Sequence, residues 1–312
     1  MARAATPAIL ALGEPMIEFN QTAPGAPGYL QGFGGDTSNA IIAAARQGAS
    51  CGYITRLGDD DFGRMFLDLW RAEGVDCSGV GIDGAAHTAV YFVTHGVGGH
   101  SFSYLRRDSA ASRMRAEHLP VELIRGARIL HVSAISQAIS QSARDSVQAA
   151  IALARQAGVK VSYDTNLRLK LWPLETARQV IADTIALTDV LLPSLEDLQV
   201  VSTLAVPDAI LDWCFAHGAK HVVLKLGRCG CIAATSDKRT TIPGYQVNAV
   251  DATGAGDCFD GAFLARLDAG DDLVAAARYA NAAAALTTTG FGAVAPLPRR
   301  AQVSSFLAAA RA

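Results

Sequence analysis

The strongest chemical signal in the sequence is the run of small and acidic residues at 251–257, Asp-Ala-Thr-Gly-Ala-Gly-Asp. A helical pattern over 256–268 begins inside this run. Unpaired N–H groups and the dipole at a helix start favour a bound anion, and small residues let a phosphate group approach the backbone. The carboxylate of Asp257 could accept the proton of a substrate hydroxyl group there. The run therefore indicates phosphoryl transfer. The three small residues are Gly254, Ala255 and Gly256.

A second glycine pair stands near the N-terminus, at the start of another helical pattern. The run 34–40 reads Gly-Gly-Asp-Thr-Ser-Asn-Ala. Gly34 and Gly35 would let a substrate lie against the backbone, and Asp36 and Asn39 offer polar contacts for its hydroxyl groups. Taken alone, this run is equally typical of a loop and a helix cap.

A third motif, Val-Val-Leu-Lys-Leu-Gly-Arg-Cys-Gly at 222–230, indicates a buried strand that ends in a turn. Its two glycines, Gly227 and Gly230, are three residues apart, as in a ligand-binding turn or in a plain hairpin turn. Further along, Asn281 lies in a helical stretch that is rich in alanine. It is either a site residue or an ordinary residue on a helix surface.

Short apolar runs alternate with helical patterns along most of the chain. This alternation predicts βαβ units, and hence a mostly parallel sheet with helices on both faces. The predicted strands are 8–13, 51–57, 128–132, 159–164, 189–192, 220–226 and 245–250. The predicted helices are 37–48, 61–73, 140–157, 174–188, 207–217, 256–268 and 272–289.

Two segments, 15–33 and 87–107, contain strand patterns with no helix between them. We expect them to form a small antiparallel sheet that acts as a lid, with additional edge strands of the main sheet as the alternative. Exposed lid strands would gain from pairing with a second copy, so a homo-oligomer is also expected.

The composition narrows the class of protein. The 312 residues include 27 Lys and Arg against 29 Asp and Glu, and this balance argues against nucleic acid as a partner. No run approaches the roughly 20 apolar residues of a membrane helix. The six cysteines are scattered, which favours buried thiols in a reducing cytosol and a cytoplasmic location. A Walker P-loop, a zinc-protease motif, a nucleophile elbow and a dinucleotide-binding glycine motif are all missing from the sequence.

Read with one another, these motifs resemble the PfkB (ribokinase-like) carbohydrate kinases. The run 251–257 is similar to the family's Asp-Thr-x-Gly-Ala-Gly-Asp signature, with Ala252 where threonine is usual, and 34–40 is similar to its first signature. The resemblance covers essentially the whole chain. It implies a single domain over 1–312, of three layers, with lid strands inserted at about 15–33 and 87–107. It also implies ATP and Mg²⁺ as cofactors, with a monovalent cation such as K⁺ as a further possibility.

The resemblance further implies roles for individual residues. Asp257 would be the catalytic base, and the amides of residues 254–256 would form the anion hole. The family's Asn-x-x-Glu motif, which organises Mg²⁺, is altered here at 192–197, so that Asp197 or Glu196 would act through water. A monovalent cation would lie near Asp251. The implied ATP-binding residues are Asn166, Lys225, Gly227, Gly230, Gly254, Gly256 and Asn281.

Two segments resemble one subgroup of the family, the 2-keto-3-deoxygluconate kinases. These are 163–172, with its Asp-x-Asn-x-Arg-x-x-Leu-Trp pattern, and 104–112, with Tyr-x-Arg-x-x-Ser-Ala-Ala-Ser. Arg106 and Arg168 could pair with the carboxylate of a sugar acid. We therefore expect phosphorylation of 2-dehydro-3-deoxy-D-gluconate at its primary hydroxyl group, giving the 6-phosphate. The implied substrate-binding residues are Gly34, Gly35, Asn39, Tyr91, Tyr104, Arg106 and Arg168.

Two other functions remain open at this point. One is a kinase of the same family for a neutral sugar such as fructose, for which neither arginine would matter to specificity. The other is a carbohydrate-binding protein on the same fold without catalysis, against which the intact Gly-Ala-Gly-Asp run at 254–257 argues.

Overall fold

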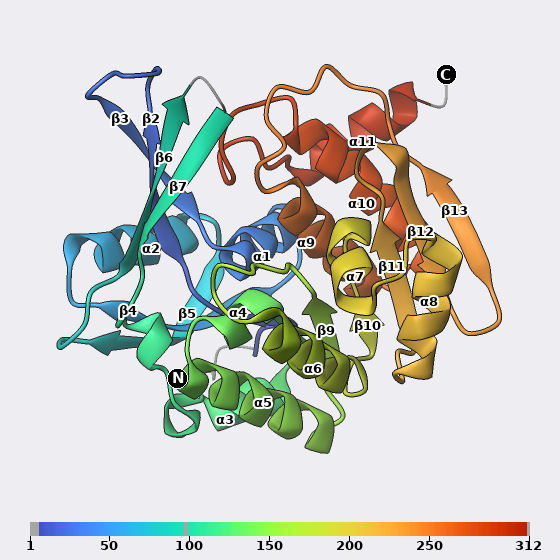
Figure 1. Ribbon diagram of the computed structural model, residues 1–312, viewed down its shortest axis with the longest axis horizontal. Coiled ribbons are helices and arrows are strands. Elements are labelled where there is room, and N and C mark those ends of the chain that lie inside the picture. The colour runs from blue at the N-terminus through green and yellow to red at the C-terminus, as the bar shows by residue number, and fades with distance from the viewer. Residues whose placement is uncertain (1–5, 97–98, 311–312) are drawn as a thin grey trace.

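The predicted alternation of strands and helices forms a nine-stranded sheet in the computed structural model, which describes residues 6–96 and 99–310 (Figure 1). Its strand order is β13-β12-β11-β10-β9-β8-β1-β4-β5, and every neighbouring pair from β11 to β5 is parallel. These parallel strands are β1 (Ile9–Leu12), β4 (Cys51–Gly58), β5 (Val75–Asp83), β8 (Ile129–Ser133), β9 (Lys160–Asp164), β10 (Val190–Leu191) and β11 (His221–Lys225). The antiparallel strands β12 (Gly230–Ala234) and β13 (Arg239–Pro243) complete one edge. The prediction of a mostly parallel sheet is confirmed.

Helices cover both faces of this sheet, as predicted, and each face has its own apolar core. One core gathers buried residues of α1 (Asp36–Arg46), α2 (Asp61–Ala72), α9 (Ala255–Asp268), α10 (Leu273–Thr287) and α11 (Arg300–Ala309). The other gathers those of α3 (Val121–Gly126), α4 (Ala134–Ala138), α5 (Gln141–Gln156), α6 (Leu174–Ile185), α7 (Leu195–Ser202) and α8 (Pro207–Ala216). Within residues 6–96 and 99–310, no single helix is long and apolar enough to cross a membrane, although the bent α7–α8 pair together reaches that length and composition.

One predicted strand is wrong. Residues 245–250 have no strand structure, and the strands of this region are β12 and β13 instead. The backbone N–H groups of Val250 and Asp251 donate to the carbonyl of Thr288, at the end of α10, at 2.7 and 3.1 Å. Two N–H groups of this segment thus bond to the end of a helix and not to a neighbouring strand. The segment connects β13 to α9 as irregular chain.

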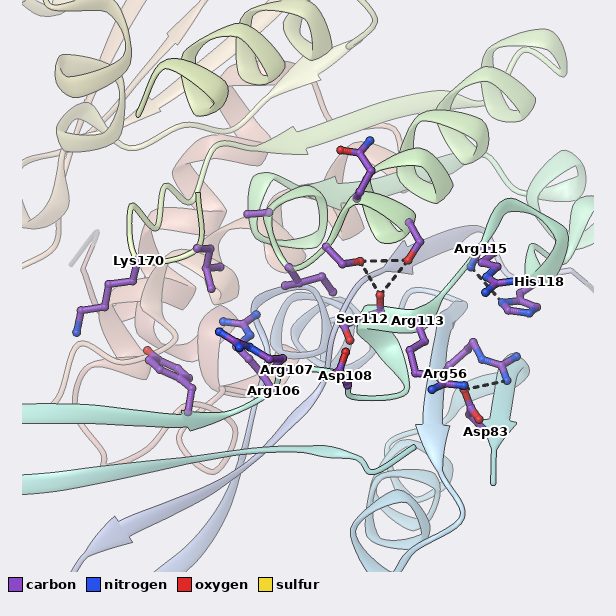
Figure 2. A pocket seen from close by; sticks show the side chains of 17 residues that line it. Arg56, Asp83, Arg106, Arg107, Asp108, Ser112, Arg113, Arg115, His118 and Lys170 are labelled. Carbon is purple, nitrogen blue, oxygen red and sulfur yellow. Dashed lines mark hydrogen bonds and ion pairs between the residues drawn. The ribbon is translucent and has the colours of Figure 1, made fainter. Parts of the chain in front are cut away.

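A separate four-stranded sheet projects from the main body (Figure 1). It contains β2 (Met16–Gln21), β3 (Tyr29–Gly34), β6 (Ala89–Gly96) and β7 (Gly99–Leu105), in the order β3-β2-β6-β7. Two antiparallel hairpins meet through a parallel β2–β6 pair, so the sheet is antiparallel except at its centre. We call this sheet the lid. A cavity opens where β7 returns to the main body (Figure 2).

The prediction of buried thiols holds for four of the six cysteines, which are all free. Cys77 is half-buried, and Cys229 is exposed. The prediction fails at Cys229 because this residue belongs to the short turn η3 (Gly227–Cys229) and precedes the buried strand β12.

The helices α1 and α9 pack closely because both are lined by small residues where they cross. A Cβ atom added at Gly261 of α9 would lie 2.0 Å from the carbonyl oxygen of Ala40 and 2.8 Å from the Cβ of Ala43. This close approach brings the first turns of the two helices to the same place.

We expect Gly261→Ala to lower the free energy of unfolding by about 1–3 kcal/mol, because the added methyl group must push the two helices apart. Urea denaturation would measure the loss. Gly84→Ala is the matched control, since no atom lies within 4 Å of its added Cβ, and it should change stability by less than about 0.5 kcal/mol. Equal effects of the two substitutions would contradict the close packing.

Candidate active site

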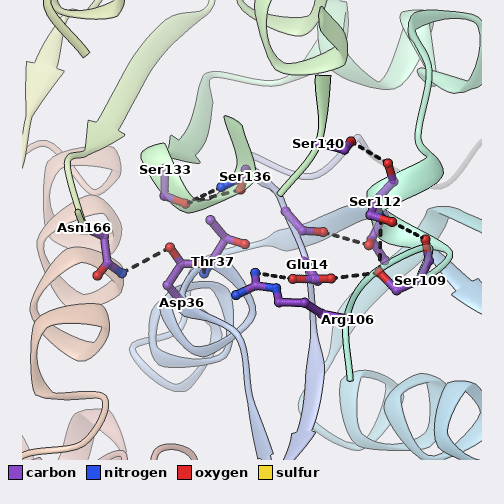
Figure 3. Close-up of polar contacts among 12 residues, drawn as sticks. Glu14, Asp36, Thr37, Arg106, Ser109, Ser112, Ser133, Ser136, Ser140 and Asn166 are labelled. Carbon is purple, nitrogen blue, oxygen red and sulfur yellow. Dashed lines mark hydrogen bonds and ion pairs between the residues drawn. The ribbon is translucent and has the colours of Figure 1, made fainter. Parts of the chain in front are cut away.

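Several chain segments meet at the carboxyl edge of the parallel strands, where open α/β sheets bind ligands. β9 ends at Asp164, β11 ends at Lys225, and α1 begins at Asp36. Asn166, two residues after β9, donates from Nδ2 to Oδ2 of Asp36 at 3.1 Å (Figure 3). Residues far apart in the sequence thus lie next to one another at this edge.

The start of α9 has the geometry of an anion site. Gly254, the residue before the helix, has a positive φ of 74°, and an added Cβ would lie 2.8 Å from the carbonyl oxygen of Ala293. The N–H of Ala255 donates to Ala252 at 3.1 Å. In the described part of the chain, no acceptor is bonded to the N–H groups of Gly256 and Asp257. The N–H of Gly254 also has no acceptor among the described residues. The amides of residues 254, 256 and 257 are therefore available to an anion, and of the three predicted amides only that of Ala255 is bonded within the protein.

Asp257 itself is half-buried and is held by a residue of α1. Its Oδ2 accepts a hydrogen bond of 2.8 Å from Nδ2 of Asn39. Burial raises the pKa of Asp257 to about 7, and the charges of Asp36 and Asp164 act in the same direction, while the Asn39 hydrogen bond and Lys225 oppose the rise. A carboxylate with a pKa near neutrality is suited to accept a proton during a reaction.

We expect Asn39→Ala to move the acid limb of the pH profile of kcat/KM upward by about one pH unit. The hydrogen bond from Asn39 stabilises the ionised form of Asp257, and a hydrogen bond to a charged group contributes enough to shift a pKa by about that amount. Initial rates between pH 5.5 and 9 would show the shift. An acid limb that stays in place would contradict this role for Asn39.

Lys225 lies in a buried cluster of charges below the first turn of α9. Its Nζ donates to Oδ1 of Asp164 at 3.2 Å and to the two carboxylate oxygens of Asp260 at 2.9 and 3.1 Å. Burial alone would lower the pKa of Lys225, but the two aspartates raise it, so the amine stays protonated. Burial and then the charge of Asp164 raise the pKa of Asp260 against the effect of Lys225. An added Cβ on Gly256 would lie 3.8 Å from Nζ of Lys225. The charge cluster is therefore in direct proximity to the first turn of α9.

Other predicted nucleotide residues have structural partners. Gly230 has a φ of 97°, and an added Cβ would lie 2.1 Å from the carbonyl oxygen of Ile242, so the turn packs against β13. Gly227, with a φ of 56°, faces open space. Asn281 is buried and donates to the carbonyls of Ile242 and Pro243 at 3.3 and 3.4 Å, which ties α10 to the end of β13.

The two predicted metal-linked acids lie in different settings. Asp197 is in the first turn of α7 and accepts from Oγ1 of Thr165 at 3.3 Å; burial and then the charge of Asp164 raise its pKa. Asp251 accepts from N and Oγ1 of Thr253 at 2.9 and 2.7 Å, and from N of Gly292 at 2.9 Å. Among the residues that the structure describes, no group of three or more His, Cys, Asp or Glu side chains is arranged to hold a metal ion directly.

The lid presents a carboxylate and two tyrosines near the glycine pair. The hydroxyl group of Tyr91 donates to Oε2 of Glu18, and the rings of Tyr91 and Tyr104 stack with centroids 6.0 Å apart. An added Cβ at Gly34 would lie 2.6 Å from the Tyr91 hydroxyl oxygen, and one at Gly35 would lie 2.5 Å from the carbonyl of Glu14. The side of each glycine on which a Cβ would lie is therefore filled by protein atoms.

The two predicted carboxylate-binding arginines lie in different settings. Arg106 forms an ion pair with Glu14, a fully buried carboxylate that also accepts from Oγ of Ser109 at 2.8 Å (Figure 3). Arg168 is exposed and donates from Nη1 to the carbonyl of Leu167 at 2.8 Å. The carboxylate of Glu14 thus neutralises the charge of Arg106.

Four acids of this region received no role from the sequence. Asp260 follows Asp257 by three residues on α9, and that spacing alone places the two on one helix face. Asp164 ends a predicted strand at the ligand-binding edge. Glu14 and Glu18 carried no local signal, because their partners Arg106 and Tyr91 lie 92 and 73 residues away.

The chain is similar along its length to proteins named as sugar kinases. It is 37% identical to probable fructokinase-3 of Arabidopsis thaliana, over 96% of this chain and 91% of that protein. It is 36% identical to fructokinase-1 of Zea mays, over 95% and 96%. Among solved structures, a putative ribokinase II from E. coli in complex with ATP and Mg²⁺ superposes with a TM-score of 0.90 at 26% identity, covering 97% of this chain and 99% of that one. The predicted ribokinase-like fold is confirmed.

These relatives contradict the predicted substrate. They are named fructokinases, whereas the sequence analysis expected a kinase for 2-keto-3-deoxygluconate. The prediction relied on two free arginines, and the buried carboxylate of Glu14 neutralises Arg106. The alternative of a kinase for a neutral sugar agrees better with the relatives.

The family itself is shown by a match over most of the chain. The model of the pfkB family carbohydrate kinases matches residues 7–300. The match includes both glycine signatures and the half-buried Asp257 at the start of α9. The chain therefore belongs to the pfkB family of carbohydrate kinases.

Proposed function

We propose that this protein transfers the γ-phosphoryl group of ATP to a hydroxyl group of a neutral sugar, with fructose as the first candidate. The observation that carries the chemistry is the carboxylate of Asp257, with a pKa of about 7, beside two unpaired N–H groups at the start of α9. The names of the relatives support fructose as the acceptor.

In the proposed reaction, Asp257 accepts the proton of the sugar hydroxyl group as its oxygen bonds to the γ-phosphorus. The bond between that phosphorus and the bridging oxygen breaks, and ADP leaves. The N–H groups of Gly256 and Asp257 donate to the phosphoryl oxygens as charge is redistributed. Lys225 keeps the first turn of α9 in position through Asp164 and Asp260.

The acidic surroundings of this site fit a nucleotide that arrives with cations. Asp36, Asp164 and Asp197 would repel the phosphates of free ATP. Kinases of this family use ATP with Mg²⁺, and Mg²⁺ supplies the positive charge that offsets this repulsion when it is bound. Because these acids are not grouped to chelate an ion directly, we infer that Asp197 would hold Mg²⁺ through water.

A neutral sugar requires hydrogen-bond partners, and the structure offers unpaired ones. Oδ1 of Asn39 is buried and accepts no hydrogen bond in the described part of the chain. An acceptor left in this state costs free energy unless a ligand satisfies it. We infer that a sugar hydroxyl group donates to Asn39 next to Asp257, while Glu18 and Tyr91 bind further hydroxyl groups from the lid.

The test is ADP release from Mg-ATP by the purified protein, with fructose, ribose and 2-keto-3-deoxygluconate offered separately. Fructose is expected to give the highest kcat/KM. A higher value on the keto acid would overturn the neutral-sugar assignment. If no sugar gave ADP while fructose still bound by calorimetry, catalysis itself would be refuted.

A further inference from the structure

A cavity of about 1040 Å³ lies beside the lid, apart from the residues assigned to catalysis (Figure 2). Its walls come from the end of the lid strand β7, the short helices η1 (Ala111–Arg113) and η2 (Ala116–His118), the start of α5 and the segment 170–171. Asp257, Gly256 and Asn39 do not line it. Arg106 and Tyr104, which the sequence analysis assigned to the substrate, do line it.

Positive charge dominates the lining. The cationic residues are Arg56, Arg106, Arg107, Arg113, Arg115 and Lys170, while the acids are Asp83 and Asp108. Six cations against two acids leave an excess of four. Two acids outside the lining also contribute: Glu14 pairs with Arg106, and Glu117 lies 3.8 Å from Arg115. When both are counted, the six cations still exceed the four acids by two.

Several of these cations have unused donors. In the described part of the chain, the side chains of Arg107 and Lys170 form no hydrogen bond or ion pair, and both are exposed. Nε of Arg56 is buried and has no acceptor. Arg56 and Arg113 share one acid, Asp83, at 3.6 and 3.1 Å. The guanidinium groups of this cavity thus have capacity for an additional anion.

The start of α5 adds backbone donors to the same cavity. Ser140 caps this helix of 16 residues, and its hydroxyl accepts from Ala143 N at 3.0 Å. The N–H groups of Gln141 and Ser142, both lining residues, bond to no acceptor among the described residues. A helix start of this kind adds to the binding of an anion that arginines already attract.

Burial and two nearby arginines disfavour protonation of a neighbouring imidazole. Burial and then the charge of Arg56 lower the pKa of His118, with Arg115 acting in the same direction against Glu117 and Asp83. An anion bound here would be attracted by the same charges that oppose protonation of this ring.

We propose that this cavity binds a small molecule that carries two or more phosphate groups, at a site separate from those for ATP and the sugar. Arginines match phosphate geometry with paired hydrogen bonds, and Figure 2 shows Arg106 and Arg107 apart from the group of Arg56, Arg113 and Arg115. Two groups of arginines favour a ligand with more than one anionic group. The volume is that of a metabolite site. The concave shape and the polar walls suit a small ligand with anionic groups at both ends.

Fructose 1,6-bisphosphate is a suitable probe, with fructose 6-phosphate as the matched ligand that has one phosphate group fewer. Each would be titrated by calorimetry into the full chain in saturating Mg-ADP and fructose, so that the proposed active site is filled. The bisphosphate is expected to bind at one site, at least about tenfold more tightly than the monophosphate, because it engages an additional charged group. Equal affinities, or no heat from the bisphosphate, would overturn the proposal.

The double substitution Arg107→Gln and Lys170→Gln locates the site. Both side chains lack partners, so the fold should tolerate the change, and the affinity for the bisphosphate should fall at least about tenfold. Arg71→Gln with Lys238→Gln, on exposed positions elsewhere, is the control for loss of two charges and should leave the affinity unchanged. Equal losses in both double variants would refute the cavity as the site. Calorimetry measures this affinity without turnover. Repeating the titration without fructose shows whether the result depends on fructose being the correct sugar.

Discussion

Replacing Asp257 by alanine is expected to lower kcat about a thousandfold, with little change in KM for ATP. A positioned general base contributes about 10² to 10⁴ in rate, and the N–H groups of residues 256 and 257 that would contact the nucleotide remain in place. ADP release at pH 8 under saturating sugar would measure the loss. A variant that keeps a tenth of the activity would exclude Asp257 as the base.

The pH dependence follows from the same group. Burial raises the pKa of Asp257 to about 7, and a base acts only when it is deprotonated. The kcat/KM of the wild type should therefore be high above pH 7 and should fall tenfold per pH unit below it. The Asp257→Ala variant should lack this acid limb.

Stability measurements separate loss of the base from loss of the fold. The pKa of Asp257 is above its ordinary value of 3.8, so the folded state favours the protonated carboxyl, and the stability that this group contributes is lost as pH rises from about 4 through 7. Asp257→Asn imitates the protonated form. We expect this variant to melt at or above the wild-type temperature at pH 8 while it is inactive; a lower melting temperature would show that the carboxylate is needed for folding.

Lys225→Met is expected to lower the free energy of unfolding by about 3–5 kcal/mol. The amine is the cation between Asp164 and Asp260, whose side chains are only 6% and 1% exposed. Removing one partner of a buried ion cluster leaves an uncompensated charge in a medium that solvates it poorly. Urea denaturation at pH 7 would measure the effect.

Two further variants test the origin of this loss. Lys220→Met removes a lysine that pairs with Asp189 at the surface, where its side chain is 56% exposed, and it should cost less than about 1 kcal/mol. Adding Asp260→Asn to Lys225→Met should recover part of the stability, because one buried charge is removed. A Lys225→Met variant as stable as Lys220→Met, or no recovery in the double variant, would refute the charge cluster as a stabilising element.

The carboxylates of this region have opposite consequences for stability and for function. Asp36 and Asp164 raise the pKa of Asp257, and burial with the charge of Asp164 raises that of Asp197. Such a concentration of acids at one edge destabilises the fold at neutral pH. The same concentration contributes to the raised pKa of Asp257. Under the proposed function it also makes nucleotide binding depend on accompanying cations.

Local sequence determined the fold class and the start of α9. Alternating apolar runs and helical patterns predicted the parallel sheet with helices on both faces, since each element buries its own periodic face. The signature at 251–257 predicted the start of α9 and the place of Asp257 in its first turn. These predictions succeeded because a helix start and its free N–H groups are properties of a few consecutive residues.

Tertiary structure alone decided which side chains meet. Asn39 bonds to Asp257 across 218 residues, and Glu14 neutralises Arg106 across 92. No spacing along the chain reveals such a pair, so the arginine that suggested a sugar acid could not be recognised as an internal ion pair. Burial, which sets the pKa of Asp257, and the close crossing of α1 and α9 at Gly261 likewise exist only after the elements have packed.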